Sequence, residues 1–165
     1  MRVAFLAPVL AVALAAAPAP AAQIVFAGGQ WAAIDRGRAC EAVSRSLRIA
    51  GKGKVQARAG FAFDPPGGRR GQFFAQLSRP PRIGSTVIMT VGQQPFLLAA
   101  RGGWAWSNGP AQEAAIIAAA RSAAGLRIES RDSSGRRFID RYLLDGAPTA
   151  IDAAAARCAG KSGRS

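Results

Sequence analysis

Two tryptophans and an arginine near the middle of the chain are the side chains best suited to hold a ligand. Trp104 and Trp106 are two residues apart, so they share one face of a short strand, and Arg101 precedes them closely. Indole rings stack on sugar rings or bases, and a guanidinium binds an anion. These three residues are therefore the candidate ligand-binding site. A simpler interpretation of the same pattern is that the tryptophans cap the core of a sheet.

Catalytic chemistry has few candidate residues. The chain contains no histidine, which excludes Ser-His-Asp and Cys-His catalysis and His-ligated metals. Nine carboxylates remain for glycosidase-type acid and base work, but turns and helix starts explain Asp35, Asp132, Glu113 and Asp152. The sequence thus predicts no catalytic residue, no metal site, no cofactor and no enzymatic activity. A glycan hydrolase using paired carboxylates is the least favoured alternative.

The N-terminus has the three parts of a secretory signal peptide. Arg2 supplies the charge, an apolar run extends from Val3 to Ala17, and small residues occupy positions 18–22. The run is shorter than the roughly 20 residues that cross a bilayer and contains a proline, so a membrane span is disfavoured. Cleavage after Ala21 predicts a signal peptide over 1–21 and a mature chain that works in the periplasm or outside the cell.

An exported chain with two cysteines predicts one disulfide, between Cys40 and Cys158. Two cysteines without histidine cannot form a four-ligand zinc site, and they do not form a Cys-x-x-Cys redox pair. The bond would close a loop of 118 positions, for which the chain-entropy model gives about 5 kcal/mol of stabilisation. It would tie the two ends of the domain together.

The mature chain is strongly basic. Lys and Arg total 22 against nine Asp and Glu, and loss of Arg2 leaves 21 minus 9, or +12. This charge favours anionic partners such as lipopolysaccharide phosphates, acidic glycans or anionic lipid, although a solvated basic surface without a dedicated partner remains an alternative. Nucleic acid is not an expected partner, because an exported protein meets little of it. The oligomeric state is not indicated.

Short alternating apolar runs separated by Gly and Pro turns predict an antiparallel sheet. One such strand spans 41–50, with Val43, Leu47 and Ile49 on its buried face. The other expected strands cover 31–33, 55–63, 73–77, 87–91, 96–100, 104–106, 127–131 and 136–144.

Helices are expected over 110–124, with Asn108 near its start as a cap, and over 148–158. The sequence therefore predicts a mainly β, α+β fold: an antiparallel sheet or sandwich-like domain with one middle helix and a short C-terminal helix. A single domain is expected over 22–158, followed by a disordered tail over 159–165.

The order of several short motifs resembles the invasion-associated locus B family of alphaproteobacterial envelope proteins, in particular short sphingomonad-type members. The motifs are RACEAVS at 38–44, GQFFAQLSRPPRIG at 71–84, and a last part from Arg131 through YLLDGA at 142–147 and AID at 150–152 to Cys158. The resemblance implies an exported β-rich protein of the periplasm or outer membrane, with no catalytic motif. Longer members carry additional cysteines, whereas this chain has two.

The leading hypothesis is a non-enzymatic cell-envelope protein with a structural or interaction role. The main alternative is a binding module for anionic glycans or lipopolysaccharide, which would use the Arg-rich surface with Trp104 and Trp106. After signal cleavage the chain is not expected to be an integral membrane protein.

Overall fold

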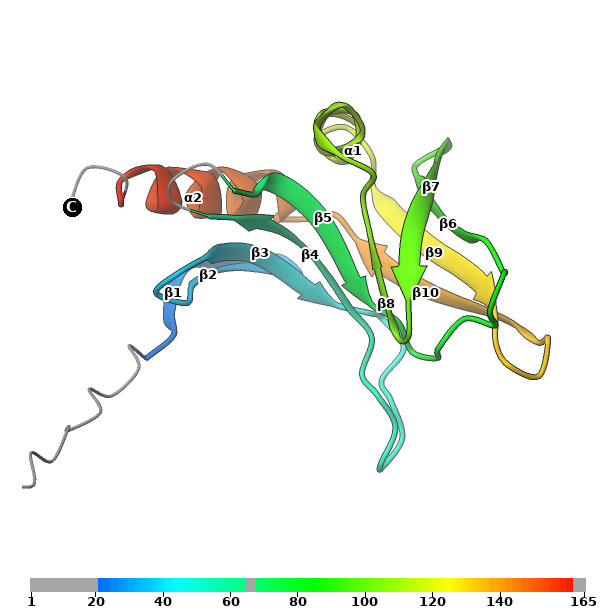
Figure 1. Ribbon diagram of the computed structural model, residues 1–165. Coiled ribbons are helices and arrows are strands. Elements are labelled where there is room, and N and C mark those ends of the chain that lie inside the picture. Colours follow the sequence, from blue (N-terminus) through cyan, green and yellow to red (C-terminus); the bar gives the residue numbers. More distant parts are fainter. Residues whose placement is uncertain (1–20, 65–67, 162–165) are drawn as a thin grey trace, which may run out of the picture.

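The computed structural model describes residues 21–64 and 68–161, and within them ten strands form one antiparallel sheet (Figure 1). The fold is mainly β, as predicted. The strands are β1 (Gln23–Gly28), β2 (Trp31–Asp35), β3 (Cys40–Arg45), β4 (Arg58–Phe63), β5 (Arg70–Gln76), β6 (Val87–Val91), β7 (Gln94–Arg101), β8 (Trp104–Trp106), β9 (Gly125–Arg131) and β10 (Arg137–Leu143). Their order in the sheet is β1-β2-β3-β4-β5-β8-β7-β6-β9-β10.

Two helices cover one face of this sheet. The first, α1 (Pro110–Ala120), contacts β5, β6 and β7, and the second, α2 (Ala147–Ala159), lies along β1 to β4 (Figure 1). The residues that α2 buries follow the helical period: Ala147, Ala150, Ile151, Ala154 and Cys158. Because most of them are alanines, α2 can lie close to the strands.

The core forms on the inner face of the sheet, which is the face that the helices cover. Strand residues alternate between this face and the outer one, so Trp31 and Ala33 in β2 point inward with Phe61 and Phe73 in β4 and β5. The Trp31 and Phe61 rings lie 6.0 Å apart, and the Phe61 and Phe73 rings lie 5.4 Å apart, edge to face. Aromatic contacts of this kind add to the burial of apolar area.

The sheet curls, so that its last strand returns to the segment that follows β3. The Leu47 backbone N–H donates to the Arg141 carbonyl at 2.8 Å, which links the end of β3 to β10. The Ser78 N–H, just beyond β5, donates to the Asp140 carboxylate at 2.9 Å. Residues 46–57, between β3 and β4, therefore leave the sheet where β10 meets it.

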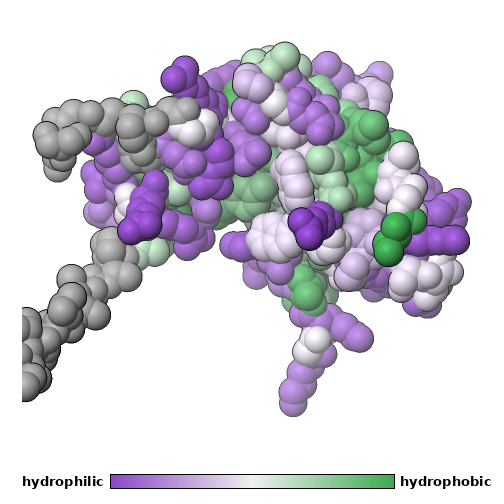
Figure 2. Space-filling view, viewed as in Figure 1, coloured by the Kyte–Doolittle hydropathy of each residue, from purple (hydrophilic) through white to green (hydrophobic). Residues whose placement is uncertain are grey.

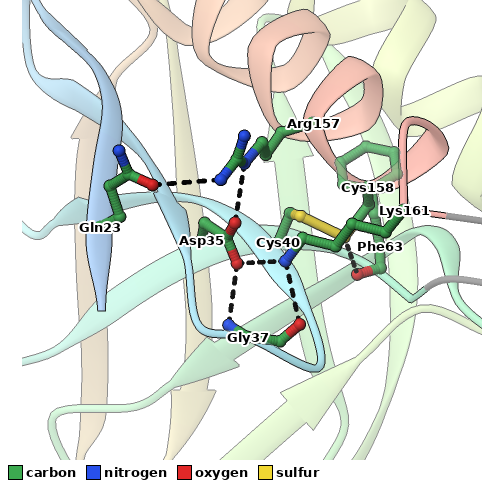
Figure 3. A network of polar contacts seen from close by, with 8 residues as sticks. All are labelled: Gln23, Asp35, Gly37, Cys40, Phe63, Arg157, Cys158 and Lys161. Atoms are coloured by element: carbon green, nitrogen blue, oxygen red, sulfur yellow. Dashed lines mark hydrogen bonds and ion pairs between the residues drawn. A yellow bond between two sulfur atoms is a disulfide. The ribbon is translucent and has the colours of Figure 1, made fainter. Parts of the chain in front are cut away.

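A disulfide and an ion-pair cluster fasten α2 to the first strands (Figure 3). Cys40 at the start of β3 is bonded to Cys158 in α2, with their Cα atoms 5.7 Å apart, as predicted. Beside it the Asp35 carboxylate accepts hydrogen bonds from Arg157 Nε at 2.7 Å and from Lys161 Nζ. The Lys161 ammonium is the main reason why the pKa of Asp35 falls to about 2. These bonds join the C-terminal helix to the N-terminal layer.

The structure corrects several local expectations. The strand predicted over 55–63 begins at Arg58 and leaves Val55 exposed, and the helix predicted over 110–124 ends at Ala120. The strand predicted over 41–50 ends at Arg45, and Leu47 and Ile49 are exposed instead of buried. Asn108 does not cap α1, whose N-cap is Gly109. The Asn108 side-chain amide donates instead to the Leu97 carbonyl, because β7 lies beside the start of the helix.

Parts of the two predicted termini lie outside the described residues. The predicted signal peptide lies outside them except for Ala21. Of the predicted tail, Ala159 ends α2 and Lys161 contacts Asp35, whereas 162–165 are not described. Within 21–64 and 68–161, no helix is long and apolar enough to cross a membrane.

Candidate functional site

The predicted tryptophans lie on the outer face of the sheet, opposite the helices. Ala105 between them is fully buried in the core, so Trp104 and Trp106 in β8 must point the other way. Trp104 is 37% exposed, and Trp106 is half-buried. The core is thus capped by Ala105 at this point, and both indole rings belong to an outer surface.

Trp104 is part of a row of opposed side chains that crosses five strands. The register places one residue from each of β3, β4, β5, β8 and β7 side by side: Arg45, Arg58, Gln76, Trp104 and Arg101. Opposed residues on antiparallel strands have Cβ atoms about 5 Å apart, so the row spans roughly 20 Å. We call these five residues the cationic row. The predicted site residues Arg101 and Trp104 are neighbours in it.

A second, apolar row runs beside the first. It consists of Val43, Gly60, Phe74, Trp106 and Ala99, which are again opposed across the same five strands. Neither row contains a carboxylate. We call the two rows together the outer platform, and it combines three arginines with three aromatic rings.

The side chains of the outer platform contact one another closely. The Phe74 and Trp104 ring centroids are 6.4 Å apart, and the Arg58 guanidinium lies 5.3 Å from the centroid of Trp104. Arg58 Nε also donates to the Gln76 side chain at 3.1 Å. These contacts hold Arg58 over the indole and fix its orientation.

Gly60 is required beneath Phe74. A Cβ at this position would lie 2.4 Å from the Ala42 carbonyl oxygen and 2.8 Å from the Phe74 ring. The phenyl ring therefore lies directly over the backbone of β4. A flat ligand could rest on it.

A groove continues from the cationic row towards the β1–β2 turn. Its volume is about 530 Å³, and its lining includes Arg45 and Arg58 of the cationic row, Val43 of the apolar row, Ala32 of β2, the last two residues of β1 and the turn residues 29–30. Since Arg58 both lines the groove and contacts Trp104, groove and platform form one continuous surface. Because it adjoins the cationic row, a ligand held on the platform can extend into this groove.

A second cavity, also of about 530 Å³, lies between residues 48–57 and the segment 78–80. Its floor includes Asp140, which is 1% exposed and accepts the Ser78 N–H. Burial raises the pKa of this carboxyl, although Ser78 and the nearby Arg48 and Arg79 oppose the shift. Asp140 is the one acid among the described residues that line this cavity, so it has no paired carboxylate there.

Most carboxylates are engaged elsewhere in ion pairs. Six of the nine pair with Arg or Lys: Asp35, Glu41, Asp64, Glu129, Asp132 and Asp152. The Arg69 guanidinium beside Asp64 lowers the pKa of that carboxyl, and Arg121 does the same for Asp152. Such pairs keep these acids ionised, which is unsuitable for a general acid. In the described residues, no group of three or more acids or cysteines is arranged to hold a metal ion.

Trp104, Trp106 and Arg101 were named as candidates from the sequence, whereas Phe74 and Arg58, which contact Trp104 in the structure, were not. Phe74 alternates with the buried Phe73, and this pairing of inner and outer aromatics was a signal that the outer face is not purely polar. The position of Arg58 depends on the register of β4 with β5, which no local pattern shows. No protein-family model, curated protein or solved structure matches the chain.

Proposed function

We propose that the protein is a non-enzymatic binding module of the cell envelope that holds an anionic glycan on the outer platform. The observation that carries the proposal is the cationic row, in which Arg45, Arg58 and Arg101 are in register with Trp104. Aromatic rings stack on the apolar faces of sugar rings, and guanidinium groups pair with carboxylate or phosphate. A charged polysaccharide offers both features along its length.

The surroundings of the platform favour this ligand over a neutral one. No carboxylate lies in either row to neutralise the three arginines internally, so their field extends to the ligand. The adjoining groove, which shares Arg45 and Arg58, gives the ligand room beyond the platform. Binding is therefore expected to weaken as salt screens the arginines.

An extracytoplasmic location supports the same proposal. The N-terminal pattern typical of a signal peptide and the Cys40–Cys158 disulfide both suit an oxidising compartment, where envelope glycans are found. The order of motifs, which resembles that of the invasion-associated locus B family, also favours a location in the cell envelope. The envelope would thus supply both the oxidising conditions and the ligand.

Titration of the purified mature protein with defined polysaccharides tests the proposal. A polyuronate, a lipopolysaccharide and neutral dextran are compared by Trp fluorescence and calorimetry at 20 and 200 mM salt. We expect binding to one or both anionic ligands that weakens with salt, and no binding to dextran. The polyuronate separates carboxylate recognition from recognition of lipopolysaccharide phosphate. Absence of anionic binding at low salt would refute the proposal.

Variants of the outer platform locate the site. Trp104→Ala and Arg58→Ala are each expected to weaken binding about tenfold, since each removes a central contact. Arg38→Ala is the control, because Arg38 is exposed and its guanidinium makes no hydrogen bond or ion pair within the described residues. Equal losses in Arg58→Ala and Arg38→Ala, with no loss in the uncharged change Trp104→Ala, would mean that total charge alone determines binding.

The same mixtures test the hydrolase alternative. Release of reducing ends is measured for the unaltered protein and for Asp140→Asn, which changes the buried carboxyl in the second cavity. We expect no release from either protein. Reproducible turnover that Asp140→Asn abolishes would replace the binding proposal with an enzymatic one.

A further inference from the structure

The connection between β3 and β4 forms a separate structural feature, which we call the arm (residues 46–57). It projects from the body of the molecule beside the end of β3 (Figure 1). Its base continues the β3–β4 pairing, since the Ser46 N–H donates to the Ala57 carbonyl at 2.8 Å. Its tip closes in a tight turn, in which the Lys54 N–H donates to the Gly51 carbonyl at 3.0 Å.

The Gln56 side chain holds the two sides of the arm together. Its amide nitrogen donates to the Arg48 carbonyl at 3.2 Å, and its oxygen accepts the Ala50 N–H at 2.9 Å. The same nitrogen lies 3.1 Å from the Ser46 hydroxyl. One side chain thus replaces several ladder bonds and holds the two sides of the arm in place.

The arm exposes apolar side chains instead of burying them. Leu47, Ile49 and Val55 are 49%, 62% and 47% exposed. In a hairpin that only connected two strands, these positions would be polar. Figure 2 shows hydrophobic residues at the base of the projection and hydrophilic ones at its end.

The cations of the arm form no ion pair. Arg48, Lys52 and Lys54 make no side-chain hydrogen bond or ion pair within the described residues, and the acid nearest to them is the buried Asp140, which lies near Arg48. Two of the three lysines in the whole chain are at this tip. Arg48 and Lys54 line the same cavity as Ile49 and Val55, so cationic and apolar side chains converge on one side of the arm.

We infer that the arm docks the protein onto an anionic lipid surface. Anionic headgroups complement the three cations, and the boundary between headgroups and acyl chains accepts exposed Ile and Val side chains. A hydrophilic glycan offers no partner for these apolar residues, and the arginine-rich outer platform does not contain them. The inference therefore concerns a second surface and does not depend on the glycan proposal.

Vesicle co-sedimentation of the mature protein tests the inference. Vesicles of phosphatidylcholine alone are compared with vesicles that contain phosphatidylglycerol, at low and high salt and without any glycan. We expect binding to the anionic vesicles, with a loss of about fivefold in affinity for each cation removed. Lys52→Glu/Lys54→Glu should lower the affinity at least about twentyfold. Ile49→Ser/Val55→Ser should reduce the binding that persists at high salt.

Two controls separate the arm from total charge and from the outer platform. Arg38→Glu/Arg70→Glu changes the net charge by the same amount at two exposed positions outside the arm, and it should retain most of the binding. Trp104→Ala should bind vesicles normally. The inference is overturned if the unaltered protein does not bind anionic vesicles or binds neutral vesicles equally well. It is also overturned if Arg38→Glu/Arg70→Glu loses as much affinity as Lys52→Glu/Lys54→Glu.

Discussion

Asp35 is the residue on which the polar contacts between α2 and the first strands converge. Its carboxylate accepts hydrogen bonds from Arg157 Nε, from Lys161 Nζ and from the Gly37 N–H. The pKa of Asp35 is lowered to about 2, chiefly by the Lys161 hydrogen bond, even though burial acts in the opposite direction. The folded state therefore favours the ionised carboxylate.

This shift predicts an acid-sensitive contribution to stability. Because the pKa falls from 3.8 in the unfolded chain to about 2 in the folded one, the contribution is present above pH 3.8 and is lost as the pH falls towards 2. Asp35→Asn should lower the free energy of unfolding at pH 7 by about 1 to 2 kcal/mol and flatten its pH dependence between 4 and 2. Urea unfolding at several pH values measures both effects.

Asp145→Asn is the matched control for this prediction. Asp145 is exposed, and its side chain forms no hydrogen bond or ion pair within the described residues. The control should keep the unfolding free energy of the unaltered protein at pH 7. Parallel profiles for the unaltered protein and Asp35→Asn would contradict the assignment.

The residues of the candidate site were predictable only in part. The spacing of Trp104 and Trp106 fixes that they share a face, but nothing local indicates whether that face is the core or the surface. Burial of Ala105 shows that the two tryptophans face the surface, because Ala105 between them points to the inner face of the sheet. Arg58 comes from a strand far away in the sequence, so only the sheet register brings it over Trp104.

Among the structural elements, the arm shows where alternating apolar residues wrongly predict a buried strand. Val43, Leu47 and Ile49 have strand spacing, yet only Val43 lies in β3. Beyond β3, the Gln56 side chain replaces backbone hydrogen bonds between the two sides of the arm. Leu47 and Ile49 therefore lie outside the sheet that would have buried them. The same departure makes the arm a candidate docking element.

A second element, the turn before α2, predicts a large effect of a small substitution. Gly146 has a φ of 83°, and a Cβ there would lie 2.1 Å from the Gly28 carbonyl oxygen. Gly146→Ala combines backbone strain with a clash against the β1–β2 turn, so we expect a loss of about 3 kcal/mol or more in unfolding free energy.

Gly135→Ala separates the two causes. Gly135 has a φ of 74°, but a Cβ there meets nothing within 4 Å, so only the backbone strain remains. Its cost should be about 1 kcal/mol. Thermal or urea unfolding of both variants compares them, and equal losses would show that the contact with the β1–β2 turn is unimportant.

At the scale of the whole molecule, the pairing of strands that follow one another in the sequence was easier to predict than the full strand order of the sheet. The runs that became β2 to β5 pair with their sequence neighbours, as short connections favour. The insertion of β8 beside β5, and of β6 between β7 and β9, follows from long-range packing that no single segment encodes. β1 was also missed, because its residues are mostly exposed at the edge of the sheet.

The disulfide is the one long-range contact that composition could predict, and it carries the last prediction. Cys40 and Cys158 are both buried and join β3 to α2 across 118 positions. Without the bond, the unfolded chain regains the entropy of a long open loop, so Cys40→Ala/Cys158→Ala should lower the unfolding free energy by about 3 to 5 kcal/mol.

Urea unfolding of the oxidised protein, the reduced protein and the variant measures this loss. Reductant should destabilise the unaltered protein and leave the variant unaffected, because only the former has a bond to break. A loss below about 1 kcal/mol would mean that the Asp35 cluster and the alanine face of α2 hold the helix in place without the covalent link.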